Sequence, residues 1–173
     1  DSGGFQVFSL GQNDDQRSMN NDQSTSSGQG ALVTIDDDGV DFKSYIDGSN
    51  HRFTPESAIE IQHKLGADII MAFDECTPDD ADEKYVKEAM DRTHRWAKRC
   101  LDYHQKSPKS KVQSPKLFGI VQGANYEQLR KDSAQFISSL PFAGIAIGGE
   151  SIGFNMEATK QILDWVNPII PEN

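Results

Sequence analysis

The sequence predicts an α/β fold that forms part of a (β/α)8 TIM barrel with a small β-hairpin near its N-terminus. Short apolar strands alternate with amphipathic helices, as in parallel βαβ units, and these strands span residues 68–73, 117–121 and 145–147. Each strand is followed by a polar or glycine position: Asp74, Gln122 and the pair Gly148–Gly149. Barrel enzymes assemble sites from several strand ends on one face, so a barrel is favoured over a doubly wound sheet. A whole barrel takes roughly 250 residues, so a chain of 173 residues would supply part of one.

The bulk composition is polar and acidic. A hydrophobic fraction of 36% and a mean hydropathy of −0.61 indicate a long solvated insertion or a piece of a larger body. The first residue is Asp1 rather than Met, and we expect the chain to be an internal part of a longer protein. A net charge of −10 argues against a surface that wraps nucleic acid unaided, because phosphate binding relies on clustered Lys and Arg.

Neither a membrane nor an oxidising compartment is indicated. No run approaches the ~18 apolar residues of a bilayer span, and no secretory signal pattern opens the chain, so a cytoplasmic protein without a membrane partner is expected. Cys76 and Cys100 form no Cys-x-x-Cys pair, so we expect reduced thiols and no zinc knuckle. The histidines show no metal-ligand spacing and are expected on the surface: His51, His63, His94 and His104.

The N-terminal third contains a polar loop followed by a hairpin. Residues 11–30 are almost entirely Asn, Asp, Gln, Ser and Gly, which predicts a disordered loop that the fold tolerates as an insertion. Ala31–Ile35 and Val40–Ile46 are apolar-rich runs separated by Asp36–Gly39, whose closing Asp-Gly favours a tight turn. A β-hairpin is therefore expected over residues 31–46.

Helix signals begin after the hairpin. Thr54 can cap a helix that has Pro55 at its first position and Gly66 as its stop. The inward face of this helix is predicted to comprise Ala58, Ile61 and Leu65. Residues 82–106 predict a second amphipathic helix through apolar or small side chains at helical spacing: Val86, Ala89, Met90, Thr93, Ala97, Cys100 and Leu101.

Two more helices follow the later strands. Asn125 with Gln128 resembles a capping box. The helix behind this box is predicted to be lined by Leu129, Ala134, Ile137 and Leu140. Asn155 can cap a last helix that runs to about Val166.

The strand ends offer polar groups that suit one flat heterocycle. The carboxylate of Asp74 can accept both hydrogens from the ring nitrogen and the exocyclic amine of a guanine-like base. Gln122 offers a donor and an acceptor, and the amides of Gly148 and Gly149 can point at a carbonyl oxygen without side-chain obstruction. Together these groups suit a carbonyl flanked by amine edges.

Each of these residues also has a purely structural interpretation. Asp74 or Glu75 can cap the next helix, and a cysteine such as Cys76 is more often a small buried hydrophobe than a nucleophile. Gln122 can be a solvated loop residue. The glycine pair can form a phosphate-binding turn, although Glu150 directly after it would repel phosphate.

The opening residues carry a second candidate group. Asp1 supplies a carboxylate, Gly3 and Gly4 let backbone approach a ligand closely, and Phe5 offers an aromatic face for stacking. A turn leading into a strand explains the same residues. The spacing is not Gly-x-Gly-x-x-Gly, so a dinucleotide fingerprint is not supported.

Taken in order, these motifs resemble the tRNA-guanine transglycosylase family, also called queuine tRNA-ribosyltransferase. The matching segments are residues 1–7, 42–44, 47–49, 54–56, 59–62, 71–78, 95–97, 118–123 and 146–149. Such a collinear series is specific, and Phe-Asp-Glu-Cys-Thr-Pro at 73–78 resembles the bacterial form. The stretch from 11 to about 37 falls outside the resemblance, because the family's usual connection is shorter there.

The resemblance implies a pentosyltransferase of queuosine biosynthesis. Such enzymes exchange guanine at the wobble position of certain tRNAs for a 7-deazaguanine, through a covalent glycosyl-enzyme intermediate. The bacterial form favours 7-aminomethyl-7-deazaguanine as the incoming base. The implied partners are tRNA and this base, and a homodimer is allowed.

The resemblance also implies residue roles. Asp1 would be the proton acceptor near the base and ribose, Phe5 would stack on the base, Asp74 and Gln122 would bind its edges, and the backbone around Gly149 would hold its carbonyl. The full set of implied substrate-binding residues is Asp1, Ser2, Gly3, Gly4, Phe5, Asp74, Cys76, Gln122, Gly148 and Gly149.

Three departures from the family matter. The family's nucleophilic Asp lies downstream of residue 173, so the segment alone is expected to be inactive. The zinc-binding Cys/His cluster and much of the basic tRNA-contacting surface also lie downstream, so no zinc ligand is expected in this chain. Glu150 stands where the family usually has an apolar residue. One alternative is a non-catalytic partner subunit of the same fold that binds the base or the tRNA. The retention of Asp1, Asp74 and Gln122 argues against it. The other alternative is an unrelated barrel enzyme that acts on a purine-like molecule.

Overall fold

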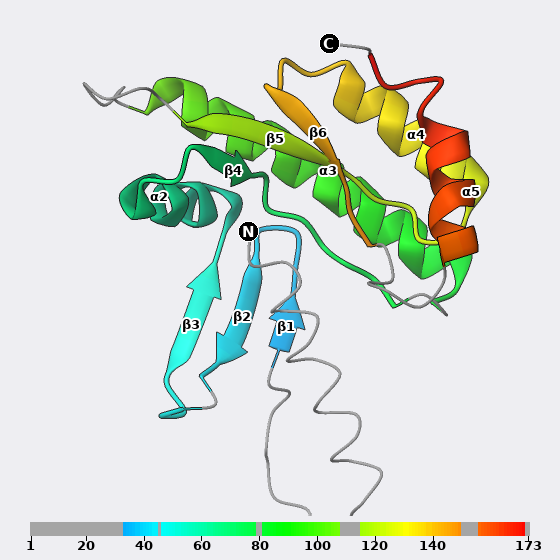
Figure 1. Ribbon diagram of the computed structural model, residues 1–173. Coiled ribbons are helices and arrows are strands. Elements are labelled where there is room, and N and C mark those ends of the chain that lie inside the picture. The colour runs from blue at the N-terminus through cyan, green and yellow to red at the C-terminus, as the bar shows by residue number, and fades with distance from the viewer. Residues whose placement is uncertain (1–32, 45, 79–80, 108–114, 150–155, 172–173) are drawn as a thin grey trace, which may run out of the picture.

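Two small sheets and the helices packed on them make up the described part of the chain (Figure 1). The computed structural model describes residues 33–44, 46–78, 81–107, 115–149 and 156–171. One sheet is antiparallel with the strand order β1-β2-β3, and the other is parallel with the order β4-β5-β6. The predicted α/β class with parallel βα units is confirmed, whereas the described strands form an open sheet rather than a closed barrel. The predicted loop at 11–30 lies outside the described residues.

The antiparallel sheet begins with a hairpin. β1 (Val33–Ile35) pairs with β2 (Val40–Lys43). Asp36 closes the turn between them, because its Oδ1 accepts hydrogen bonds from the N–H groups of Asp38 at 2.8 Å and Gly39 at 2.9 Å. The hairpin expected from the apolar runs is therefore present in the structure.

A third strand, β3 (Asn50–Phe53), extends the hairpin and was not predicted from the sequence. Its residues are mostly polar and exposed, so the alternation that marks a half-buried strand is missing. Arg52 instead forms ion pairs with Asp36 of the turn at 2.9 Å and Asp41 of β2 at 2.6 Å. Charge pairing across neighbouring strands takes the place of apolar patterning here.

The helix α2 (Pro55–Leu65) has the predicted ends. Thr54 and Ser57 form a reciprocal capping box, and Gly66 ends the helix with a φ of 73°, in the left-handed region. Its predicted inward face was wrong in part, because Ile61 is 39% and Leu65 is 78% exposed. The residues that do turn inward are Pro55, Ala58, Ile59 and Gln62.

Gln62 gives α2 its orientation. The side-chain Nε2 donates to the carbonyl of Met71 at 2.9 Å, and Oε1 accepts from the Met71 N–H at 2.8 Å. Met71 ends β4 (Ile69–Met71), the outer strand of the parallel sheet. The amide of Gln62 therefore takes the place of a neighbouring strand at this position, which no periodicity of apolar residues could indicate.

The parallel sheet continues with β5 (Lys116–Val121) and β6 (Gly144–Ile147). β4 pairs with β5, and β5 pairs with β6, both in parallel. The predicted strands are thus present, and each strand end lies within two residues of its predicted position. Ile69, expected to be buried with the rest of its strand, is exposed at the start of β4.

The helix α3 (Glu83–Lys106) begins at the N-cap Asp82 and buries all of the positions predicted for it, together with Trp96. In Figure 1, α3 lies along the parallel sheet. Because Asp82 caps this helix, Asp74 and Glu75 do not, and the capping interpretation of these two residues is wrong.

The helix α4 (Glu127–Ser138) begins later than the predicted capping box requires. Its N-cap is Tyr126, which makes no side-chain cap bond, while Gln128 donates to Asp132 at 2.7 Å. Ala124 adopts a φ of 45°, so the chain turns before the helix starts and the Asn-x-x-Gln spacing no longer fits. The last helix is α5 (Met156–Val166), whose predicted cap Asn155 lies outside the described residues.

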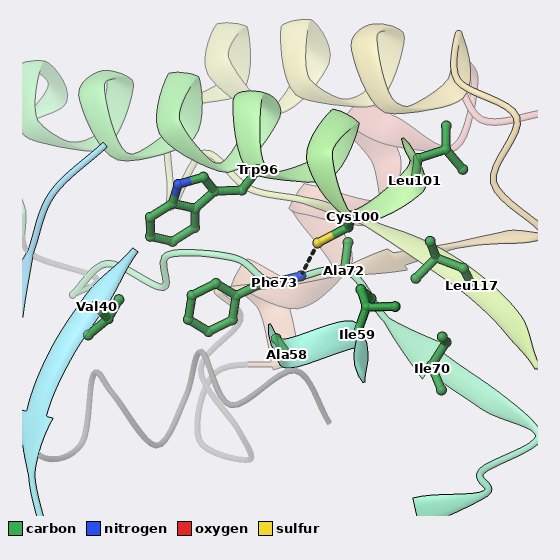
Figure 2. Packing of buried hydrophobic residues seen from close by; sticks show 10 residues of the cluster. All are labelled: Val40, Ala58, Ile59, Ile70, Ala72, Phe73, Trp96, Cys100, Leu101 and Leu117. Carbon is green, nitrogen blue, oxygen red and sulfur yellow. Dashed lines mark hydrogen bonds between the residues drawn. The ribbon is translucent and has the colours of Figure 1, made fainter. Parts of the chain in front are cut away.

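A buried core joins α2, α3 and the first strands of the parallel sheet (Figure 2). Phe73 stacks on Trp96 with 5.0 Å between ring centroids, and the Phe73 N–H donates to Cys100 Sγ at 3.3 Å. Burial raises the pKa of Cys100 to about 12, so this thiol is an inert part of the core. These contacts fix the chain immediately before Asp74.

The acidic hairpin turn docks on basic residues of α3. Asp37 Oδ1 accepts from Arg92 at 3.4 Å and from Arg95 at 2.7 Å. Trp96 Nε1 donates to the Asp37 carbonyl at 2.8 Å. The antiparallel sheet is therefore tied to α3 through its turn, and part of the chain's positive charge is used internally.

Candidate functional site

Strand ends of the parallel sheet bring two of the predicted residues into contact. Asp74 follows β4 by three residues, and Gln122 follows β5 directly. Gln122 Nε2 donates to Asp74 Oδ2 at 2.7 Å. Both residues are buried, with Asp74 8% and Gln122 2% exposed, so the interpretation of Gln122 as a solvated loop residue is wrong.

The predicted glycine pair packs directly against Gln122. A Cβ on Gly148 would lie 2.7 Å from Gln122 Nε2, and one on Gly149 would lie 2.5 Å from Gln122 Oε1. Gly149 also has a φ of 59°, in the left-handed region. A side chain at either position would therefore displace the amide of Gln122.

The two glycine amides differ in availability. The Gly148 N–H donates to the carbonyl of Val121 at 2.9 Å, which extends the ladder between β5 and β6 by one residue. The expectation that both amides can face a ligand is therefore wrong for Gly148. The Gly149 N–H makes no hydrogen bond within the described ranges, so it is the amide of this pair that can bind one.

Besides the Gly149 N–H, the side-chain oxygen Oε1 of Gln122 can bind a ligand. Its Oε1 is buried and has no hydrogen-bond partner among the residues that the structure describes. Leaving a buried polar atom unpaired costs about 1–3 kcal/mol, so such atoms in native proteins call for an explanation. A ligand with an N–H group beside Gln122 would remove this cost.

Ser133 and His94 hold the backbone of Gln122 in place, and neither was singled out from the sequence. The Gln122 N–H donates to Ser133 Oγ at 3.1 Å, and Ser133 Oγ lies 3.0 Å from His94 Nε2. A hydroxyl that accepts from the Gln122 N–H can also donate its own proton to His94 Nε2 when the His94 ring is neutral. Burial lowers the pKa of His94 to about 4, consistent with this state.

The surface placement expected of the histidines holds for His51 alone. His94 is half-buried and stacks on Phe136 with 4.1 Å between ring centroids. His63 Nε2 and His104 Nδ1 lie 2.9 Å apart, and both residues are half-buried. These residues lie on different helices, so their contacts have no signal in the local sequence.

We expect the free energy of unfolding to fall as the pH drops from about 6.5 toward 4, through His94. An unfolded His binds a proton near pH 6.5, whereas folded His94 resists protonation down to about 4, so acid favours the unfolded state across this window. The loss is on the order of 2 kcal/mol, after allowance for partial solvent exposure. Urea unfolding at several pH values measures it. His94→Gln, which cannot titrate, should show a weaker pH dependence, and identical curves for both proteins would contradict the assignment.

Glu75 anchors the loop that follows Asp74. Its carboxylate forms an ion pair with Arg92 and accepts a hydrogen bond from the Tyr85 hydroxyl at 3.1 Å. The Glu75 N–H donates to Thr93 Oγ1 at 3.0 Å. Burial, together with the neighbouring Glu75 carboxylate, raises the pKa of Tyr85 to about 12, so Tyr85 keeps its proton as a donor.

The remaining predicted site residues are placed less fully. Cys76 is half-buried, and its Sγ lies 3.9 Å from the carbonyl of Thr77. Residues 1–5 and Glu150 lie outside the described residues. The roles predicted for them, and for Cys76 as a lining residue, stay predictions.

The described residues contain neither a metal-ligand cluster nor a membrane-spanning helix. No group of three or more His, Cys, Asp or Glu could hold a metal ion there, and Cys100 is already used in the core. These residues therefore do not fit a zinc centre. No helix in the described ranges is both long enough and apolar enough to cross a membrane.

Comparisons with known proteins give a consistent match. A family model described as "Queuine tRNA-ribosyltransferase" matches residues 1–173. A queuine tRNA-ribosyltransferase of Herpetosiphon aurantiacus is 49% identical over 173 residues, 100% of this chain and 38% of that protein. One of Natranaerobius thermophilus is 48% identical over 172 residues, 99% of this chain and 40% of that protein. The chain thus spans about two fifths of the length of these curated relatives.

Proposed function

Because this chain belongs to the queuine tRNA-ribosyltransferase family, we propose that it carries the base-recognition part of a tRNA-guanine transglycosylase site. In the whole protein, the reaction would replace guanine at the tRNA wobble position by a 7-deazaguanine. The bacterial form of residues 73–78 supports 7-aminomethyl-7-deazaguanine as the incoming base. With tRNA as the substrate, the reaction would take place in the cytoplasm.

The contact between Gln122 Nε2 and Asp74 Oδ2 at 2.7 Å carries the proposal. A carboxylate and a carboxamide side by side can bind adjacent groups on the edge of one base. Asp74 would accept from the ring N–H and the exocyclic amine of guanine, while the Gly149 N–H would donate to the ring carbonyl. Gln122, held between them, would align both partners with the plane of the base.

We infer that the parallel sheet supplies three consecutive strands of a (β/α)8 barrel. The order β4-β5-β6 follows the order of the chain, and the polar groups gather where these strands end. Asp1 would act as the proton acceptor, with Ser2, Gly3, Gly4 and Phe5 around the base and Cys76 in the lining.

No residue of this chain is proposed as the nucleophile, which the family resemblance places downstream of residue 173. We therefore propose that the 173 residues bind the base without turnover. Zinc in the whole protein would be bound by downstream residues, because the described residues here do not fit a metal centre. A homodimer is compatible with this proposal.

Calorimetric titration with free bases tests base recognition. The chain is expected to bind guanine and 7-aminomethyl-7-deazaguanine but not adenine. Adenine presents an amine where the Gly149 N–H requires an acceptor, and its six-membered ring has no N–H for Asp74. Equal binding of adenine and guanine, or no binding of either guanine-like base, would contradict the proposal.

An exchange assay tests the absence of turnover. The chain is mixed with labelled guanine and unmodified tRNA, and label that enters the tRNA is counted. No incorporation above background is expected, since the covalent intermediate needs a nucleophile that is not assigned here. Incorporation above background would show that a residue of this chain supplies that nucleophile.

A further inference from the structure

Arg130 is a buried cation beside the proposed site. It lies on α4 and is 0% exposed. A guanidinium stays charged at any physiological pH, and burying a charge is costly unless hydrogen bonds compensate for it. An interior arginine therefore needs a set of acceptors, and the positions of those acceptors indicate what the side chain does.

Backbone carbonyls at and after the ends of β5 and β6 accept hydrogen bonds from Arg130. Nε donates to Ala124 at 2.7 Å, and Nη1 donates to Val121 at 3.1 Å, both where β5 ends. Nη1 also donates to Gly148 at 2.6 Å, and Nη2 donates to Gly149 at 3.1 Å, both after β6. One side chain thus connects the loop that carries Gln122 to the glycine pair that packs on it.

The backbone at Gly123 brings the start of α4 close enough for the Arg130 side chain to make these contacts. Gly123 has a φ of 134°, and a Cβ there would lie 2.7 Å from the backbone nitrogen of Arg130. Glycine at this position therefore lets α4 begin directly against the end of β5. Lysine could not replace the planar fork of arginine, because a single ammonium group cannot point at separate carbonyls in the same plane.

The bond to the Gly148 carbonyl also fixes the direction of the Gly149 N–H. Carbonyl and N–H point in opposite directions across a trans peptide, and no cis peptide occurs among the described residues. Since the Gly148 carbonyl faces Arg130, the Gly149 N–H faces away from it. A positive charge on the carbonyl side also polarises the peptide and strengthens its N–H as a donor.

The geometry points to Arg130 as a positioning residue that holds the Gly148–Gly149 peptide so that its N–H meets the carbonyl of the bound base. This inference rests on the proposed function and deepens it, because it assigns the preference for a carbonyl-bearing base to a side chain that does not touch that base. Arg130 acts through the Gly148–Gly149 peptide. Its contribution to binding should therefore depend on how strong a hydrogen-bond acceptor the base presents to the Gly149 N–H.

The test compares guanine with 6-thioguanine, whose sulfur is a weaker acceptor at the same position. Calorimetry gives the ratio of the two affinities for the native chain, for Arg130→Lys and for the control Lys131→Gln on the same helix. The native chain and the control should prefer guanine. In Arg130→Lys this preference should shrink roughly tenfold, because the Gly149 N–H is no longer held in line.

A purely structural role would weaken the binding of both bases equally and leave their ratio unchanged, which would overturn the inference. A second readout is the amide resonance of Gly149 in the ligand-free chain, which should shift or broaden in Arg130→Lys and stay unchanged in Lys131→Gln. Failure of the native chain to bind either base would contradict the proposed function instead. In that case an unchanged Gly149 resonance would also overturn the positioning role, and a shifted one would support it.

Discussion

Replacing Asp74 by Asn is expected to weaken guanine binding by roughly 100-fold. The carboxylate at the end of β4 can accept from two N–H groups of the base and from Gln122 Nε2 at the same time. An asparagine keeps one acceptor oxygen and turns a donor toward groups that also donate. Loss of a charge-assisted hydrogen bond and the new donor–donor conflict act in the same direction.

The control for this variant is Asp102→Asn, which removes the same charge from an exposed position on α3. Hypoxanthine, which lacks the exocyclic amine of guanine, adds a second comparison. Native protein should bind hypoxanthine more weakly than guanine, while Asp74→Asn should distinguish the two bases much less. Native affinity for guanine in Asp74→Asn would remove this carboxylate from the proposed site.

Truncating Trp96 to Ala is expected to lower the free energy of unfolding by about 4 kcal/mol. Trp96 is completely buried, and its ring stacks on Phe73, one residue before Asp74. Its Nε1 also holds the carbonyl of Asp37 in the hairpin turn. The truncation therefore opens a cavity in the core and releases the antiparallel sheet from α3.

Trp96→Phe separates these two effects, because it keeps an aromatic ring against Phe73 and removes the hydrogen bond to Asp37. We expect this variant to lose about 1–2 kcal/mol. Urea unfolding monitored by circular dichroism measures both variants at neutral pH. A loss below about 1 kcal/mol for Trp96→Ala would mean that the core does not depend on this side chain.

The sequence predicted those elements whose signals are local. Thr54, Pro55 and Gly66 mark the ends of α2 through their own backbone preferences. Asp74 and Gln122 are far apart in the chain, but their placement in one site could be expected because parallel strands end at one edge of a sheet. The direct hydrogen bond between their side chains was not predicted.

The features that were missed join residues without a local pattern. The inward face of α2 depends on Gln62 reaching Met71, so counting apolar residues favoured Ile61 and Leu65 instead. The availability of Gly148 was misjudged, because the sheet ladder runs one residue past β6. Ser133, His94 and Arg130 act through contacts between different elements, which only the three-dimensional arrangement reveals.

The side-chain amide of Gln62 also limits how β4 can associate with other strands. Asp68 and Ala72 direct their ladder bonds toward β5, so Ile69 and Met71 present their backbone groups to the opposite side. With Met71 occupied by Gln62, Ile69 is the β4 residue left to bond outward in the described part of the chain. One such residue is too short a template for cross-β growth, so Gln62 limits unwanted pairing along this side of β4 in the described part of the chain, without a charge or a proline.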